Sequence, residues 1–192
     1  PFGALVVRDP FGNEVLSTCS EVETGANGPL EASVRVRLSV LGHPVIEQTY
    51  TLFADEKRLD VAVNMLKDPT PLLETYLAFP FNIPDGKFKL EGPLCVVDPV
   101  SDLMPGAYPD RLTAQNWVSV TDGHLSVVWN SLDAPVVSLA RLWPGRVSPA
   151  HSAKVRDDIE HPVPSAEQFG GGTIYSMLTA NNFGTNFSVS QS

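Results

Sequence analysis

Charged side chains are scarce in this sequence, and most of those present are acidic. Lys, Arg, Asp and Glu make up 18% of the 192 residues, and 22 acidic against 13 basic side chains give a net charge of −9. A phosphate backbone or an anionic lipid surface would repel such a chain. The composition therefore argues against nucleic acid and against membrane surfaces as partners.

Long apolar runs and targeting signals are missing as well. No stretch is long enough to cross a bilayer, and no signal peptide precedes the first strand. The chain begins at Pro1 without Met, so we expect it to be a fragment cut from a larger protein. The missing signal peptide therefore assigns no compartment.

Cysteine is nearly absent, since only Cys19 and Cys95 occur. A domain of this size can build a core without a covalent cross-link. We therefore expect two buried thiols, with a disulfide between them as the alternative.

Helical periodicity is also missing, and short alternating runs take its place. Residues 31–40 place Ala, Val and Leu on one side and Glu, Ser and Arg on the other, which is typical of a half-exposed strand. Strands at residues 45–53 and 59–65 follow after short polar connections. The three segments predict an antiparallel meander.

The clearest hairpin signal lies in residues 115–135. Two runs rich in Val and Trp flank Asp122-Gly123, a dipeptide that suits a two-residue type I′ turn. Such a turn would place Val120 opposite Leu125 and give the hairpin one apolar and one mostly polar face. That pattern indicates an antiparallel sheet that covers a core on one side.

Several shorter strands complete the predicted fold. They are expected at residues 4–7, 72–81, 87–90, 94–97, 135–142, 173–179 and near residue 187, whereas loops are expected at residues 25–29, 98–112 and 143–168. No fixed repeat and no break in composition divides the chain. The sequence predicts one all-β domain over residues 1–192, with about 12 strands in two or more layers and little helix.

Motifs for catalysis and metal binding are absent from the sequence. The four histidines form no HExxH or HxH pattern, and no GxSxG motif is present. The densest group of possible ligands, residues 157–161, is interpreted as a solvated acidic loop. Possible glycosidase carboxylates are Glu47, Glu74, Asp110 and Asp133, but single surface acids usually have structural or solvated roles. We therefore predict no catalytic and no metal-binding residue in this chain.

Aromatic side chains are the best candidates for binding, because aromatic rings stack on the apolar faces of sugars. Trp117 is the strongest of them, since its predicted neighbours Ser119 and Ser126 are polar. Packing in the core is the alternative reading for a Trp on a strand.

Four segments together resemble a known family. They are LETYLAFPF (73–81), LMPGAYPD (103–110), QNWVSVTDGHLSVVWNSLDAP (115–135) and TIYSMLTANNFGTNFSVSQS (173–192), and a strand IEQTYTLF (46–53) precedes them. Their order and character resemble the C-terminal β-sandwich of glycoside hydrolase family 38, the α-mannosidases. The similarity extends from about residue 30 to the end of the chain.

The resemblance implies an antiparallel β-supersandwich of the galactose-mutarotase-like type. It also implies a zinc-dependent, retaining α-mannosidase as the whole protein, with the nucleophile and the zinc ligands in an N-terminal catalytic domain that nothing here matches. We therefore expect a non-catalytic C-terminal accessory domain without a cofactor of its own, which packs on that catalytic domain. The resemblance suggests that polar residues at the rim of a mannoside site contact carbohydrate, and these candidates are Asp110, Arg111, Gln115, Asn116, Trp117, Asn181 and Asn182.

Two other hypotheses stay open: an autonomous carbohydrate-binding module, and an aldose-epimerase-like enzyme. An accessory domain should expose a broad apolar patch where its partner packs. A binding module should expose Trp117 or Tyr108 on a concave face. An epimerase should hold a histidine within about 6 Å of a carboxylate in a pocket, so that proton transfers are linked.

Overall fold

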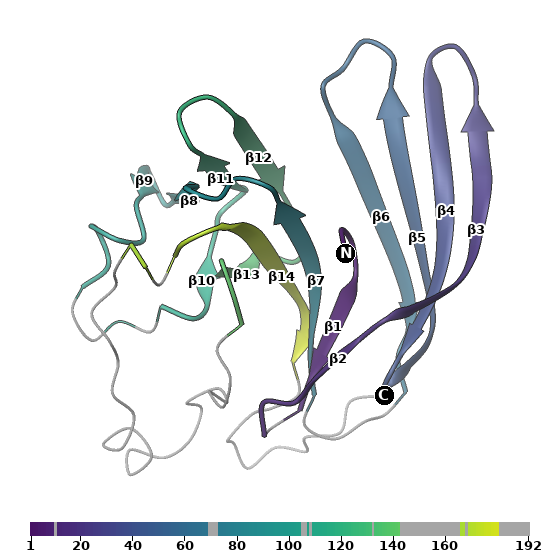
Figure 1. Ribbon diagram of the computed structural model, residues 1–192, viewed down its shortest axis with the longest axis horizontal. Helices are drawn as coiled ribbons and strands as arrows, with labels where there is room; N and C mark the ends of the chain where they lie inside the picture. Colours follow the sequence, from purple (N-terminus) through teal and green to yellow (C-terminus); the bar gives the residue numbers. More distant parts are fainter. Residues whose placement is uncertain are drawn as a thin grey trace.

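The chain folds into antiparallel β-sheets, as expected. The computed structural model describes residues 1–9, 11–68, 73–104, 107, 109–131, 133–142, 166–167 and 169–180. These residues form 14 strands in three antiparallel sheets and no helix (Figure 1). The all-β prediction is confirmed, with more strands than the dozen expected. Within the described part of the chain, no helix has the length and apolar character needed to cross a membrane.

The first four-stranded sheet contains the predicted meander. Its strands, in spatial order, are β3 (Thr18–Asn27), β4 (Glu31–Val40), β5 (His43–Phe53) and β6 (Leu59–Leu66). The prediction of a loop from residue 25 is wrong, because β3 continues to Asn27. The Ala26 N–H donates to Ser33 Oγ at 2.8 Å, and Gly25 lies so close that an added Cβ would be 2.4 Å from that oxygen.

The two faces of this sheet differ in chemistry. One face carries ion pairs that link neighbouring strands, including Arg37 with Glu21 and Glu47, both at 2.9 Å. The other face is apolar, and Leu38 and Ile46 on it are buried in the core. The period-two alternation of residues 31–40 therefore predicts the two faces correctly.

A six-stranded sheet forms the centre of the molecule (Figure 1). Its strands, in spatial order, are β10 (Leu112–Thr113), β13 (Val136–Leu139), β14 (Gly172–Ala180), β7 (Glu74–Phe81), β1 (Leu5–Arg8) and β2 (Glu14–Leu16). Pro80 is the penultimate residue of β7, so its missing N–H falls near the end of a strand, where it is tolerated.

The second four-stranded sheet holds the predicted hairpin. Its strands, in spatial order, are β12 (Ser126–Asn130), β11 (Trp117–Thr121), β8 (Lys87–Gly92) and β9 (Cys95–Val97). Val120 pairs with Val127 and Val118 with Trp129, so the predicted register is wrong by two residues. A shift of two preserves the face of each side chain, and Val118 and Val120 are fully buried as expected.

The register shift follows from the side chain of Asp122. Its Oδ1 accepts the N–H groups of His124 and Leu125, both at 2.8 Å. These bonds fold residues 122–125 into a four-residue turn in place of the two-residue turn that Asp-Gly predicts. Leu125, assigned to the apolar face by the sequence, is therefore 53% exposed.

One hydrophobic core joins the three sheets. Leu77 and Phe79 of the six-stranded sheet, Ile46 of the first four-stranded sheet and Val118 and Val120 of the second all belong to it. Both four-stranded sheets therefore pack against the same face of the central sheet. A smaller cluster around Val6 and Tyr76 lies on the opposite face.

The two cysteines contradict the prediction of buried thiols. Cys19 and Cys95 are exposed and unpaired. Each lies on an edge strand, β3 or β9, where a short side chain is left uncovered.

Candidate functional site

The candidate rim residues fall in separate parts of the structure. Gln115, Asn116 and Trp117 lie together at the start of β11. Asp110 and Arg111 precede β10 at the end of the central sheet. Asn181 and Asn182 lie outside the described residues, as do Tyr108 and residues 157–161.

Gln115 and Trp117 line a shallow depression of about 500 Å³, called here the Trp117 depression. Its other lining residues come from β8, β9 and the turn between them: Glu91, Gly92, Leu94, Cys95 and Val96. Gln115 is exposed and Trp117 is half-buried. An aromatic ring beside an exposed amide and a carboxylate is a surface that can contact a sugar.

Hydrogen bonds position the residues of the Trp117 depression. The Gln115 N–H donates to the Glu91 carbonyl at 2.8 Å, and Asn116 Nδ2 donates to Glu91 Oε2 at 3.0 Å. The Ser131 N–H donates to the Asn116 carbonyl at 3.3 Å. Asn116 therefore ties together β8 and the loop after β12, and Gln115 is the freer side chain for a ligand.

Arg111 belongs to a buried polar cluster on the face of the central sheet that points away from the main hydrophobic core. Its guanidinium forms an ion pair with Glu74, and the Tyr76 hydroxyl donates to Glu74 Oε2 at 2.9 Å. Burial and the Glu74 charge raise the pKa of Tyr76. Asp110 is buried beside this cluster, and its carbonyl accepts from Ser138 Oγ at 2.6 Å. These contacts are structural, and sugar contact by Asp110 or Arg111 stays a prediction.

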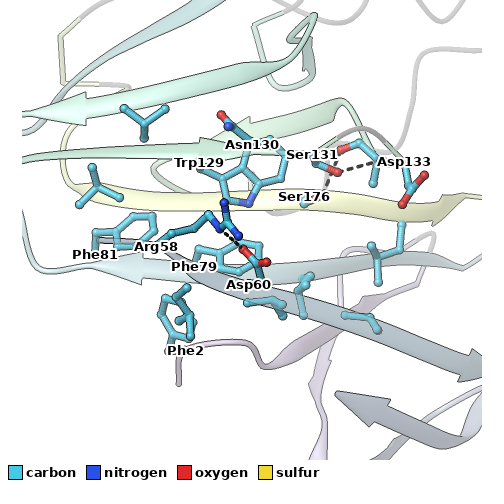
Figure 2. Close-up of a pocket in the computed structure, with 18 of the residues that line it drawn as sticks. Phe2, Arg58, Asp60, Phe79, Phe81, Trp129, Asn130, Ser131, Asp133 and Ser176 are labelled. Atoms are coloured by element: carbon cyan, nitrogen blue, oxygen red, sulfur yellow. Dashed lines mark hydrogen bonds and ion pairs between the residues drawn. The ribbon is translucent and has the colours of Figure 1, made fainter. Parts of the chain in front are cut away.

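A second concavity, larger than the Trp117 depression, was not predicted from the sequence. It is an open groove of about 750 Å³ between β6, β12 and the central sheet, called here the inter-sheet groove. Phe79 and Phe81 of β7 and Trp129 of β12 line it, together with Phe2 near the amino terminus (Figure 2). Phe2 packs edge-on against Phe79 and Phe81, with ring centroids 5.4 and 6.0 Å apart.

Polar side chains border the inter-sheet groove. Arg58 Nε donates to Asp60 Oδ1 at 2.9 Å (Figure 2). The Arg58 guanidinium also lies 4.8 Å from the centre of the Phe53 ring. Asp133 and Ser131 line the groove as well, and Ser131 Oγ accepts the Ala134 N–H at 3.0 Å. The rim thus carries charges of both signs around an apolar floor.

The described histidines lie away from both concavities. His43 is fully buried, with Nδ1 3.2 Å from the Leu41 carbonyl and Nε2 3.5 Å from Thr75 Oγ1. Burial lowers its pKa. His124 is exposed in the hairpin turn. Within the described ranges, no group of three or more His, Cys, Asp or Glu side chains suits a metal ion.

The apolar face of the first four-stranded sheet continues beyond the core. Val22, Val34, Leu52 and Leu59 lie on that face with exposed fractions of 64, 38, 55 and 41%, and are called here the apolar extension. Figure 1 shows the far ends of these strands projecting past the other sheets. Large apolar patches are rare on monomeric proteins, so exposed apolar side chains on one face of four neighbouring strands are typical of an interaction surface.

No family model matches this chain, and no curated protein matches its sequence.

Proposed function

We propose that this chain is the non-catalytic C-terminal accessory domain of an α-mannosidase-type glycoside hydrolase. The apolar extension is the observation that carries the proposal, because an accessory domain needs an apolar surface on which its partner domain packs. The opposite face of the same strands is polar and ion-paired. An exposed apolar face of this kind on a free-standing domain would invite association.

The proposed fold is a β-supersandwich of the galactose-mutarotase-like type. The packing of two four-stranded sheets on one face of a six-stranded sheet supports it. The resemblance of residues 73–81, 115–135 and their neighbours to the α-mannosidase family supplies the functional part of the proposal.

In this proposal the chemistry belongs to the partner domain. The resemblance to the α-mannosidases implies that the zinc and the nucleophile lie in an N-terminal catalytic domain. The accessory domain then stabilises the catalytic domain and presents polar side chains near its sugar site.

Activity measurements test this assignment. α-Mannosidase activity should require both the whole hydrolase and zinc. The 192-residue chain alone should show no activity, with or without added zinc. In the whole hydrolase, Leu52→Lys should lower both activity and melting temperature, because it places a charge in the interface. Asn64→Lys, which adds the same charge on the polar face of β6, is the control. Activity in the isolated chain, or equal effects of the two variants, would refute the proposal.

A carbohydrate-binding module is the second candidate, and the Trp117 depression favours it. Isothermal titration with methyl α-mannoside and with mannobiose tests this function on the isolated chain. Binding that Trp117→Ala and Gln115→Ala each weaken at least tenfold would support it. Binding that both variants leave unchanged would exclude the Trp117 depression as the site.

A further inference from the structure

The Trp117 depression brings an aromatic ring and a carboxylate together on one outward face. Val118 of β11 pairs with Leu90 of β8, and both side chains are buried in the core. Trp117 and Glu91, their neighbours along the chain, therefore belong to the opposite, outward face of the second four-stranded sheet. Both side chains line the depression, and both are half-buried. A ligand seated in the depression meets the two groups at once.

Glu91 carries a negative charge that no cation balances within the described part of the chain. Its Oε2 accepts a hydrogen bond from Asn116 Nδ2 at 3.0 Å. The ion pairs of the described residues all involve other carboxylates. Lys89 shares the outward face of β8, but it does not line the depression. A carboxylate that is partly withdrawn from water and lacks a counter-charge favours a positively charged ligand.

The Trp117 ring adds a second attraction for a cation. The face of an indole attracts a positive charge more strongly than the other aromatic side chains do. The side chains of Leu94, Cys95 and Val96 make much of the remaining lining apolar. The net charge of −9 on the whole chain also raises the local concentration of cations. This combination suits a cation that carries apolar groups around its charge.

The hydrogen-bonding groups of the depression favour a methylated ammonium over a primary one. A primary ammonium has three N–H donors, each of which needs an acceptor. The side-chain oxygens of Glu91 and Gln115 are the polar acceptors in the lining, and one Glu91 oxygen is already used by Asn116. A quaternary ammonium has no donor to satisfy, and its methyl groups contact the ring and the apolar lining directly.

Leu94 provides an apolar rim for such a ligand. Gly92 pairs with Cys95, so Pro93 and Leu94 form a two-residue turn between β8 and β9. Leu94 has a φ of +61°, which favours glycine at this turn position, and its side chain is fully exposed. The leucine thus strains the backbone and gains no burial in return. Strained residues of this kind cluster at ligand sites.

We propose that the Trp117 depression binds a small molecule with a quaternary ammonium group, whose charge lies between the Trp117 ring and the Glu91 carboxylate. Leu94 and Val96 contact its methyl groups. The depression and the apolar extension belong to different sheets, so this inference does not depend on the accessory role. The cation and a neutral sugar are alternative ligands for the same depression.

Isothermal titration of the 192-residue chain with choline tests the proposal. Neopentylcarbinol, in which a carbon atom replaces the nitrogen of choline, is the matched neutral ligand. Choline should bind about tenfold more tightly, because only the cation gains from the ring face and the carboxylate. Equal affinities for the two ligands, or no detectable binding of choline, would overturn the proposal.

Charge-removing variants locate the cation. Glu91→Gln keeps an acceptor for Asn116 and removes only the charge, so it should weaken choline binding and leave the affinity for neopentylcarbinol unchanged. Glu31→Gln removes the same charge from an exposed position of the first four-stranded sheet and should bind choline normally. Equal affinities of these two variants for choline would exclude Glu91 as its counter-charge and overturn the proposed site.

The Trp117 ring and the rim are tested separately. Trp117→Ala should weaken choline binding about tenfold. Leu94→Gly should raise the melting temperature, because glycine adopts this φ without strain, and should nevertheless weaken choline binding. A gain in stability together with a loss of affinity cannot come from misfolding. Full affinity for choline in both variants would contradict the proposal.

Two further ligands identify the source of the cation. Phosphocholine carries the same cation beside a phosphate that Glu91 repels, so it should bind more weakly than choline. Tighter binding of phosphocholine would assign the depression to a lipid headgroup and overturn the assignment to a cation alone. Methyl α-mannoside should leave choline binding unchanged, and displacement of choline by it would reassign the depression to a sugar.

Discussion

The side-chain amide of Gln48 donates to the backbone carbonyl of Gly3 at 2.7 Å and joins two sheets. Gln48 lies on β5, and Gly3 lies just before β1 of the central sheet. The Tyr50 hydroxyl donates to Gln48 Oε1 at 2.6 Å, so one buried amide uses both its donor and its acceptor. This contact fixes the first four-stranded sheet against the amino-terminal residues.

Removal of the Gln48 amide should therefore destabilise the protein. Gln48→Leu leaves the Gly3 carbonyl and the Tyr50 hydroxyl without their partner, and a buried polar group left unsatisfied costs about 1–3 kcal/mol. Urea denaturation followed by tryptophan fluorescence measures the loss. Asn64→Leu, which makes the same kind of change on an exposed position of β6, should have little effect. Equal stabilities of the two variants would contradict this prediction.

Gly3 cannot accept a side chain for two reasons. Its φ is +70°, and an added Cβ would be 1.8 Å from the Tyr50 hydroxyl oxygen. Gly3→Ala should reduce the free energy of unfolding by at least about 1–3 kcal/mol, the usual cost of a non-glycine residue in this backbone region. Gly28→Ala is the matched control, since the nearest atom to its added Cβ is 3.7 Å away. A Gly3→Ala variant as stable as this control would count against the prediction.

The sequence predicts strands well where apolar and polar residues alternate, and poorly where only pairing with a neighbouring strand makes a segment extended. β4 has the bounds expected from its alternation, Glu31–Val40. β3 was missed because Gly25 and Asn27 suggest a loop, and only pairing with β4 makes the segment a strand. The packing of two sheets on one face of the central sheet depends on contacts between distant segments, which no local pattern contains.

The hairpin turn offers a test of what sets its register. Asp122→Ala removes the acceptor of the His124 and Leu125 N–H groups, so the amides at the end of the hairpin should exchange faster with solvent. Asp122→Asn keeps a side-chain oxygen and should preserve most of the protection. These hydrogen bonds also lower the pKa of Asp122, so the turn should loosen as pH falls through that lowered pKa. Amide exchange measured by NMR at several pH values distinguishes the two variants. Identical exchange rates in Asp122→Ala and Asp122→Asn would argue against a role of the Asp122 side chain in fixing the turn.

The buried ion pair between Arg111 and Glu74 should be costly to break. The side chains of Arg111 and Glu74 are 16% and 3% exposed. Removal of one partner takes this compensation away from the other buried charge, so Glu74→Gln should cost about 3–5 kcal/mol. The double replacement Glu74→Leu with Arg111→Leu should cost less than the sum of the single changes. Strict additivity in a double-mutant cycle by urea denaturation would show that the two charges are not coupled.

The candidate site was only partly predictable. The closeness of Gln115, Asn116 and Trp117 follows from their position in the sequence, and their contact with Glu91 follows from the pairing of β11 with β8. The inter-sheet groove combines Phe2, Phe79 and Trp129, which lie far apart along the chain. The apolar alternation of β6 and β12 was visible in the sequence, but nothing local indicates that the two edges border one gap.

The pH dependence of stability provides a last test, because His43 is buried next to the central sheet. Burial lowers its pKa below the ordinary value of 6.5, Lys67 adds to this effect, and the Leu41 carbonyl and Asp68 oppose it. The unfolded chain therefore binds a proton more readily than the folded protein, so stability falls as pH drops below 6.5. The loss continues until the pH reaches the folded-state pKa, with a slope of at most about 1.4 kcal/mol per pH unit. Unfolding free energies between pH 8 and 5, a range spanning that of histidine titration, should show a smaller decline in His43→Gln than in the unmodified chain. His124→Gln, which replaces the exposed histidine of the hairpin turn, should show the full fall in unfolding free energy. If His43→Gln also shows the full fall, the pH dependence comes from other groups.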